Sequence, residues 1–127
     1  MPRLLSQVNS TGAVEIGAGI KQVVDLDAAI ATTTTTSESN IDTFDASIFR
    51  SAQYQIQITR GSLYHVTTLN VLHDGTDVYM SEFGTIKTGS TLATFDADID
   101  SGNVRVRATP AFSLSTAFKI SKTLTKV

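Results

Sequence analysis

A strictly alternating run near the middle of the chain limits what this sequence can fold into. From Gln53 to Ile58 polar and apolar residues alternate without a break. Successive side chains of a β-strand point to opposite faces, so this two-residue period predicts a strand with one face buried. The predicted outer face carries Gln53, Gln55 and Gln57, and the predicted inner face carries Tyr54, Ile56 and Ile58.

A turn signal follows this run and predicts a hairpin. Arg60-Gly61-Ser62 suits a three-residue loop with glycine in the left-handed conformation. Such a loop places Ile58 opposite Tyr64 and so brings the apolar sides of the two strands together. The region Phe49–Phe83 is then predicted to form three consecutive antiparallel strands.

The third of these strands is predicted from a second turn, Asp74-Gly75, a strong short-range hairpin signal. With these two residues as the loop, Val71 lies opposite Val78. Continuing that register would put Val66 on the polar face, so we expect a bulge near Thr67–Thr68 that reverses the alternation.

A further hairpin is predicted from Leu92–Asp100 and Asn103–Ala108, joined by Ser101-Gly102. A two-residue loop sets opposite charges directly across from each other, which contributes about 0.2–1 kcal/mol for each pair. The register predicts two inward apolar pairs and two outward charged pairs: Ile99 with Val104, Ala97 with Val106, Asp98 with Arg105, and Asp96 with Arg107.

The remaining segments also favour strands. Ala117–Leu124 predicts a closing strand with Phe118 and Leu124 inward, and Lys21–Ala29 suits a strand better than a helix because its β-branched pair lowers helix propensity. Many short strands without a convincing helix predict an all-β fold, an antiparallel β-sandwich or jelly roll with an extended N-terminal arm. We assign residues 1–40 to the arm and threonine-rich segment, and 41–127 to the sandwich.

Composition excludes several classes of function. The chain has 127 residues and no cysteine, so disulfides and thiolate chemistry are absent. The formal net charge is -2, without a basic tail, so we expect no nucleic-acid partner. No stretch approaches the roughly 18 apolar residues of a membrane span, and we expect no membrane partner.

No residue pattern predicts catalysis, a cofactor or a metal site. Asp96-Ala97-Asp98-Ile99-Asp100 resembles the start of a calcium loop, but the sixth position is Ser101 and the twelfth is Arg107 instead of glycine and glutamate. The expected arginine partners favour a salt-bridged strand face. We therefore predict no catalytic residues, no cofactor-binding residues and no metal ligands, and a chain that is not an enzyme.

The two histidines and one tyrosine are weaker candidates. His65 is predicted to lie on the glutamine face in solvent, and His73 to be a turn residue beside Asp74. Three or four ligands are needed for zinc, so two histidines do not suffice. Tyr79 is predicted at the core edge, with exposure to a partner or a sugar as the alternative.

Four short motifs, in order, resemble a β-rich module of virion structural proteins of tailed phages, especially marine cyanophages. The match runs from about Ile41 to Val127. Its motifs are Arg50-Ser51-Ala52-Gln53-Tyr54, Leu72-His73-Asp74-Gly75-Thr76, Glu82-Phe83-Gly84-Thr85, and Thr94 through Ile99 with Gly102 to Arg105. In that family the module often lies within longer chains. The resemblance implies a structural or accessory particle protein and carries no catalytic residues.

Two classes of function remain open. The first is a non-enzymatic virion protein, either a small capsid decoration subunit or a subunit of a tail or fibre appendage, with major capsid or tail proteins as partners. The alternative is a carbohydrate-binding or adhesin module for host attachment. The resemblance favours the first and implies a location in the virion.

Charge asymmetry predicts self-association. Asp77 and Glu82 have no obvious partners, and Lys119 and Lys122 are expected on the outer side or edge of the last strand. An acidic and a basic margin could pack against copies in a ring. We therefore expect a homo-oligomer, a trimer before other numbers by analogy with virion accessory proteins. Its interface is expected to include the apolar arm residues Val14, Ile16, Val23, Val24 and Leu26.

Overall fold

The computed structural model describes residues 23–127, and these form eight strands and no helix. The strands are β1 (Val24–Thr33), β2 (Ser39–Asp45), β3 (Phe49–Arg60), β4 (Leu63–His73), β5 (Val78–Lys87), β6 (Ala93–Asp100), β7 (Asn103–Pro110) and β8 (Thr116–Lys126).

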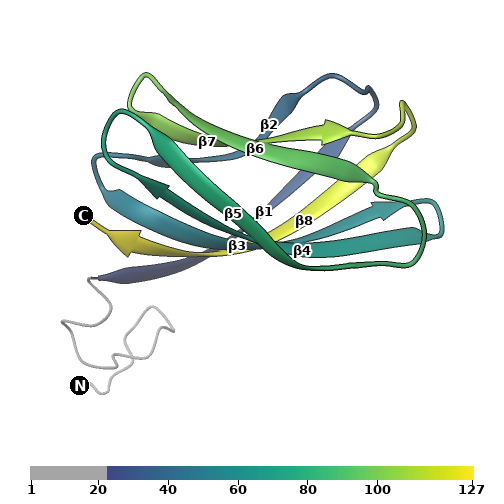
Figure 1. Ribbon diagram of the computed structural model, residues 1–127, viewed down its shortest axis with the longest axis horizontal. Coiled ribbons are helices and arrows are strands. Elements are labelled where there is room, and N and C mark those ends of the chain that lie inside the picture. Colours follow the sequence, from purple (N-terminus) through teal and green to yellow (C-terminus); the bar gives the residue numbers. More distant parts are fainter. Residues whose placement is uncertain (1–22) are drawn as a thin grey trace, which may run out of the picture.

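The strands form two sheets packed face to face (Figure 1). One sheet has five strands in the order β1-β8-β3-β4-β5, and the other has three in the order β2-β7-β6. All neighbouring strands are antiparallel. The predicted all-β antiparallel sandwich is therefore confirmed.

The core lies between the sheets and uses the inner face predicted for β3. Tyr54, Ile56 and Ile58 are fully buried, while the three glutamines that alternate with them are exposed. Phe118 of β8 and Val104 of β7 are equally buried. Burying a large apolar side chain contributes about 1.5–3 kcal/mol, so this cluster is the main source of stability.

The first hairpin has a shorter loop than predicted. Arg60 pairs with Leu63, so only Gly61-Ser62 lie in the loop, and Ile58 lies opposite His65 instead of Tyr64. Gly61 has a φ of 61° in the left-handed region. This one-residue difference turns every side chain of β4 to the other face.

The second hairpin has a longer loop than predicted. Val71 pairs with Met80, and His73 pairs with Val78, which leaves the four residues Asp74–Asp77 in the loop. The Asp74 carboxylate accepts hydrogen bonds from the backbone N–H groups of the third and fourth loop residues, at 2.9 and 2.7 Å, and these fix the wider turn. Gly75 has a positive φ, 98°.

The expected bulge lies opposite Thr67, but its extra residue is in β5, so it does not reverse the alternation of β4. Val66 pairs with Ile86 and Thr68 pairs with Phe83, so two residues of β5 oppose one residue of β4. The extra residue falls at Gly84, whose φ is 68°. The alternation of β4 continues unbroken because the shorter first loop has already set its faces.

The hairpin of β6 and β7 matches the predicted register in full. Asp98 lies opposite Arg105, and Ile99 lies opposite Val104. Ser101 and Gly102 both have positive φ, 53° and 82°, as the two central residues of a type I′ hairpin turn require.

The predicted arm, residues 1–40, contributes a strand to the sandwich. Within it, β1 forms one edge of the five-stranded sheet and pairs with β8 from Val24 to Thr33. The predicted interface residues Val14 and Ile16 lie outside the described residues.

Candidate interaction surfaces

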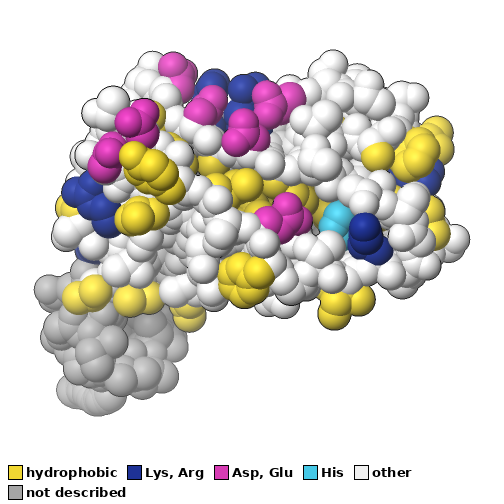
Figure 2. All heavy atoms as spheres, viewed as in Figure 1, with side chains coloured by type: hydrophobic (Ala, Val, Ile, Leu, Met, Phe, Trp, Pro, Cys, Tyr) yellow, Lys and Arg dark blue, Asp and Glu magenta, His cyan; other side chains and the backbone are white. Residues whose placement is uncertain are grey.

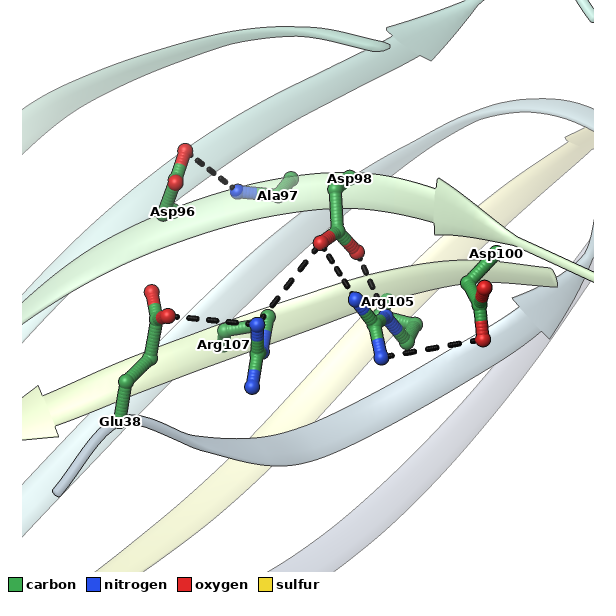
Figure 3. A network of polar contacts seen from close by, with 7 residues as sticks. All are labelled: Glu38, Asp96, Ala97, Asp98, Asp100, Arg105 and Arg107. Atoms are coloured by element: carbon green, nitrogen blue, oxygen red, sulfur yellow. Dashed lines mark hydrogen bonds and ion pairs between the residues drawn. The ribbon is translucent and has the colours of Figure 1, made fainter. Parts of the chain in front are cut away.

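Acidic and basic side chains gather on the exposed face of the three-stranded sheet (Figure 2). The Arg105 guanidinium binds both carboxylate oxygens of Asp98, each at 2.6 Å (Figure 3). This bidentate hydrogen bond lowers the pKa of Asp98, and it raises the pKa of Arg105.

The second predicted pair is rearranged. Asp96 lies opposite Arg107 in the register, yet its carboxylate accepts a hydrogen bond from the backbone N–H of Ala97 at 2.8 Å. Arg107 instead lies 3.2 Å from Glu38 and 3.8 Å from Asp98. The charged face is therefore one network across β6, β7 and the residue before β2, and its ion pairs are partly exposed.

No grouping of three or more histidine, aspartate or glutamate side chains among residues 23–127 is arranged to hold a metal ion. The same part of the chain contains no helix long and apolar enough to cross a membrane. The aspartates of β6 instead contact arginines or backbone, as the network above shows.

His65 is buried and does not lie in solvent as predicted. It is 3% exposed and points inward, since the shorter hairpin loop puts it on the inner face of β4. Its Nδ1 accepts a hydrogen bond from the backbone N–H of Leu92 at 3.2 Å. Burial lowers the pKa of His65.

His73 holds the second turn in place from inside. It is 2% exposed, and its Nε2 lies 2.7 Å from the backbone oxygen of Phe49. Its Nδ1 accepts a hydrogen bond from the N–H of Gly75 at 2.9 Å. Nε2 therefore carries the proton, and the side chain connects the loop to β3.

The structure overturns the prediction that Lys122 lies on the outer side or edge of the last strand. Lys122 is 7% exposed, and its Nζ lies 2.6 Å from Oδ2 of Asp42 on the opposite sheet. The same oxygen accepts a hydrogen bond from the Tyr54 hydroxyl at 2.8 Å. Burial, together with this carboxylate, raises the pKa of Tyr54. Residues 118 and 122 are an even number of positions apart in β8. Alternation along the strand therefore predicts that Lys122 lies on the same inner face as Phe118.

The outer face of the five-stranded sheet, which points away from the three-stranded sheet, carries almost no charge. Strand pairing places five rows of side chains on it, and Lys119 is the one charged member. The rows run across the strands: Val24, Thr125, Ser51, Leu72 and Tyr79; Leu26, Thr123, Gln53, Asn70 and Ser81; Ala28, Ser121, Gln55, Thr68 and Phe83; Ile30, Lys119, Gln57, Val66 and Ile86; Thr32, Ala117, Thr59 and Tyr64.

Large apolar side chains protrude from this outer face. Seven of the twelve exposed large hydrophobic residues of the described chain belong to it, so the apolar exposure is concentrated there. They are Leu26, Ile30, Tyr64, Leu72, Tyr79, Phe83 and Ile86. In Figure 2 hydrophobic side chains stand out singly along the lower side of the molecule, where this sheet lies.

A shallow groove crosses one end of the outer face, beside Tyr79. Polar side chains of Gln53, Asn70 and Thr123 line it together with the apolar side chain of Leu72. Tyr79 is 55% exposed, with its hydroxyl 3.5 Å from the carboxylate of Asp74. Tyr79 is therefore exposed, and does not lie at the core edge as predicted.

Comparison by sequence identifies no relative: no known family matches the chain, and no curated protein does. Comparison by structure finds phage tailspike proteins. The tailspike of Acinetobacter baumannii phage AM24 superposes with a TM-score of 0.52 at 9% identity, over 82% of this chain and 26% of the tailspike. The tailspike of Acinetobacter phage vB_ApiP_P1 has a TM-score of 0.43 at 19% identity, over 84% of this chain and 23% of that protein.

The likeness to the AM24 tailspike concerns the fold. The sandwich occurs there as one module of a longer phage protein, since this chain spans about a quarter of its length. The β-rich fold implied by the sequence resemblance is thus also found in a phage virion protein.

Proposed function

We propose that this chain is a non-enzymatic structural module of a phage virion, and that its place is a tail or fibre appendage. The observation that carries the proposal is the sandwich fold shared with a module of a phage tailspike. The four sequence motifs that resemble virion modules of marine cyanophages support the same class of protein independently. A capsid decoration subunit fits the motifs equally well but has no support from the fold.

The side chains of the described residues favour a structural role. Asp98, Arg105 and Arg107 hold one another on an exposed strand face, and the histidines accept hydrogen bonds from backbone groups. Groups used in this way act as supports of the fold and are poorly placed to abstract or donate a proton to a substrate.

Self-association is part of the proposal. We propose a homo-oligomer, with a trimer before other numbers. The charge argument loses two of its supports. Lys122 is buried against Asp42, and Glu82 accepts a hydrogen bond from Thr67 at 2.8 Å. The uncharged outer face of the five-stranded sheet supports self-association in its place.

Imaging of intact particles tests the location. Gold-labelled antibodies against the purified chain should decorate the tail or its appendages in electron micrographs. Decoration of the head alone would move the protein to the capsid, and particles without label would contradict the virion role. Antibodies preabsorbed with the purified chain provide the control.

A carbohydrate-binding module for host attachment is the second candidate, and the groove beside Tyr79 favours it. An exposed aromatic ring next to amide and hydroxyl side chains is a chemistry suited to a sugar, which offers both apolar faces and hydroxyl groups. A glycan array tests this function. Tyr79→Ala should abolish any signal, whereas Tyr64→Ala, on the same face but outside the groove, should keep it.

A further inference from the structure

A lysine amine, two carboxylates and a phenol meet between the two sheets, on the side chains of Lys122, Asp42, Asp27 and Tyr54. We propose that Lys122 and Asp42 condense to an amide bond, which covalently links β8 of one sheet to β2 of the other. The inference goes beyond the proposed function, because it concerns a reaction within one chain and holds or fails wherever that chain lies in a particle.

Strand pairing surrounds Lys122 with these groups. Lys122 lies opposite Asp27 of β1 and opposite Tyr54 of β3, since β8 runs between those two strands. Asp42 reaches the same point from β2, in the other sheet (Figure 1). Among residues 23–127, Lys122 is the one lysine that is buried. The fold therefore holds a shielded amine against a carboxylate that is 80 positions away in the chain.

The amine and the carboxyl group are in contact. Nζ of Lys122 lies 2.6 Å from Oδ2 of Asp42, and the two side chains are 6% and 11% exposed. Groups held together in this way do not have to meet by diffusion, which removes a large part of the entropic barrier to their reaction. The ion pair is the reactant of this step, and the freshly folded chain carries it until the bond closes.

The step balances without any co-reactant. A proton moves from the ammonium to Oδ2, which converts the ion pair into a neutral amine and a carboxylic acid. The nitrogen lone pair then forms a bond to Cγ of Asp42, and the bond between Cγ and Oδ2 breaks. Oδ2 leaves as water with two of the three ammonium protons, and the third stays on the amide nitrogen. The product is uncharged, so the cost of keeping two ions away from water disappears.

Tyr54 and Asp27 contact the two reacting groups. The Tyr54 hydroxyl donates a hydrogen bond to Oδ2 of Asp42 at 2.8 Å, which draws electrons from the carboxyl group that is attacked. Burial raises the pKa of Tyr54, so this hydroxyl keeps its proton. Oδ2 of Asp27 lies 3.8 Å from Nζ, on a side chain that is 63% exposed. Asp27 is therefore placed to relay the second proton from the nitrogen to the departing oxygen.

Intact mass spectrometry of the folded, purified chain tests the bond. We expect a mass below that of the sequence by one molecule of water, at once or after several days at room temperature. Trypsin should then release peptides 22–50 and 120–126 joined together, because cleavage after residue 122 is blocked. Fragment spectra must place the link at Asp42, since peptide 22–50 also contains Asp27. A chain that keeps its full mass, or a link at Asp27, overturns the proposal.

Two lysine variants provide matched controls. Lys122→Arg keeps the positive charge but offers a poor nucleophile, so it should keep its full mass. Lys119→Arg changes an exposed lysine of the same strand and should lose water as the parent does. A cyclic imide at Asp74-Gly75 also removes one water, but it joins no two peptides and does not need Lys122. Equal loss of water in Lys122→Arg and in the parent, without joined peptides, would therefore overturn the amide.

Asp27→Asn tests the relay in a chain that should fold normally, because the side chain of residue 27 is largely exposed. We expect the joined peptide to accumulate at least about tenfold more slowly than in the parent, followed from the moment of synthesis by cell-free translation. The melting temperature of the unreacted variant should match that of the unreacted parent. Bond formation at the parent's rate would overturn the role of Asp27.

Discussion

Lys122 of β8 and Asp42 of β2 form an ion pair that joins the two sheets through the core. Nζ lies 2.6 Å from Oδ2, and the two side chains are 6% and 11% exposed. Tyr54 donates its hydroxyl to the same carboxylate. At this point of the interior three polar groups satisfy one another.

Removal of one partner should destabilise the protein strongly. Lys122→Met leaves a buried carboxylate without its cation, so we expect the free energy of unfolding to fall by about 3–5 kcal/mol in urea denaturation. Lys119→Met is the matched control, because Lys119 lies three residues away on the exposed face of the same strand. That variant should stay within about 0.5 kcal/mol of the parent.

A double variant separates the charge from the packing. Lys122→Met combined with Asp42→Leu removes both charges and should recover part of the lost stability, since no ion remains buried alone. The Tyr54 hydroxyl then loses its acceptor, so recovery should be incomplete. If the double variant lost as much unfolding free energy as Lys122→Met and Asp42→Leu lose together as single variants, the pairing would be contradicted.

The sequence predicts strands well here because local rules decide them. Alternation from Gln53 to Ile58 and the two-residue turn at Ser101-Gly102 depend only on neighbours in the chain, and both are confirmed. The register of β4 depends on distant residues. The inward position of His65 is supported by the backbone of Leu92, and that of Thr67 by Glu82.

The candidate surface was only partly predictable for a similar reason. An outward glutamine row on β3 follows from alternation, but the uncharged face needs the order β1-β8-β3-β4-β5, which brings sequence-distant strands together. Hydropathy also favoured Tyr64 and Val66 as inward residues. The one-residue difference in loop length placed both on the outer face instead.

Chelation should leave the protein unchanged. We expect the same melting temperature with and without an excess of a strong chelator, because Asp98 binds Arg105 and Asp96 binds backbone. A drop of several degrees would show that a metal stabilises the folded state. Added calcium that restored the original value would identify the aspartates of β6 as its site.

The turn at Gly75 should tolerate no β-branched residue. Gly75→Val forces such a side chain into a φ of 98°, so we expect a loss of roughly 1–3 kcal/mol in thermal unfolding. Thr76→Val, at the next position of the same loop, keeps a negative φ and the backbone hydrogen bond to Asp74, and should change little. Equal stability of the two variants would contradict the strained turn.

Buried His65 should make the protein less stable in mild acid. Its pKa is lowered in the folded state, so below about 6.5, the ordinary histidine pKa, the unfolded chain takes up a proton that the folded chain does not. The free energy of unfolding should therefore fall as the pH decreases from 7 to 5. The contribution of His65 stops changing once the pH lies below the pKa of His65 in the folded chain.

The variant His65→Gln isolates this effect from the other titrating groups. Glutamine offers an acceptor for the N–H of Leu92 but does not ionise, so the variant should be less stable at pH 7 and lose less stability on acidification. Urea denaturation at half-unit pH steps measures both slopes. Parallel slopes for parent and variant would show that His65 ionises equally in the folded and unfolded chains, and that its burial has no effect on its pKa.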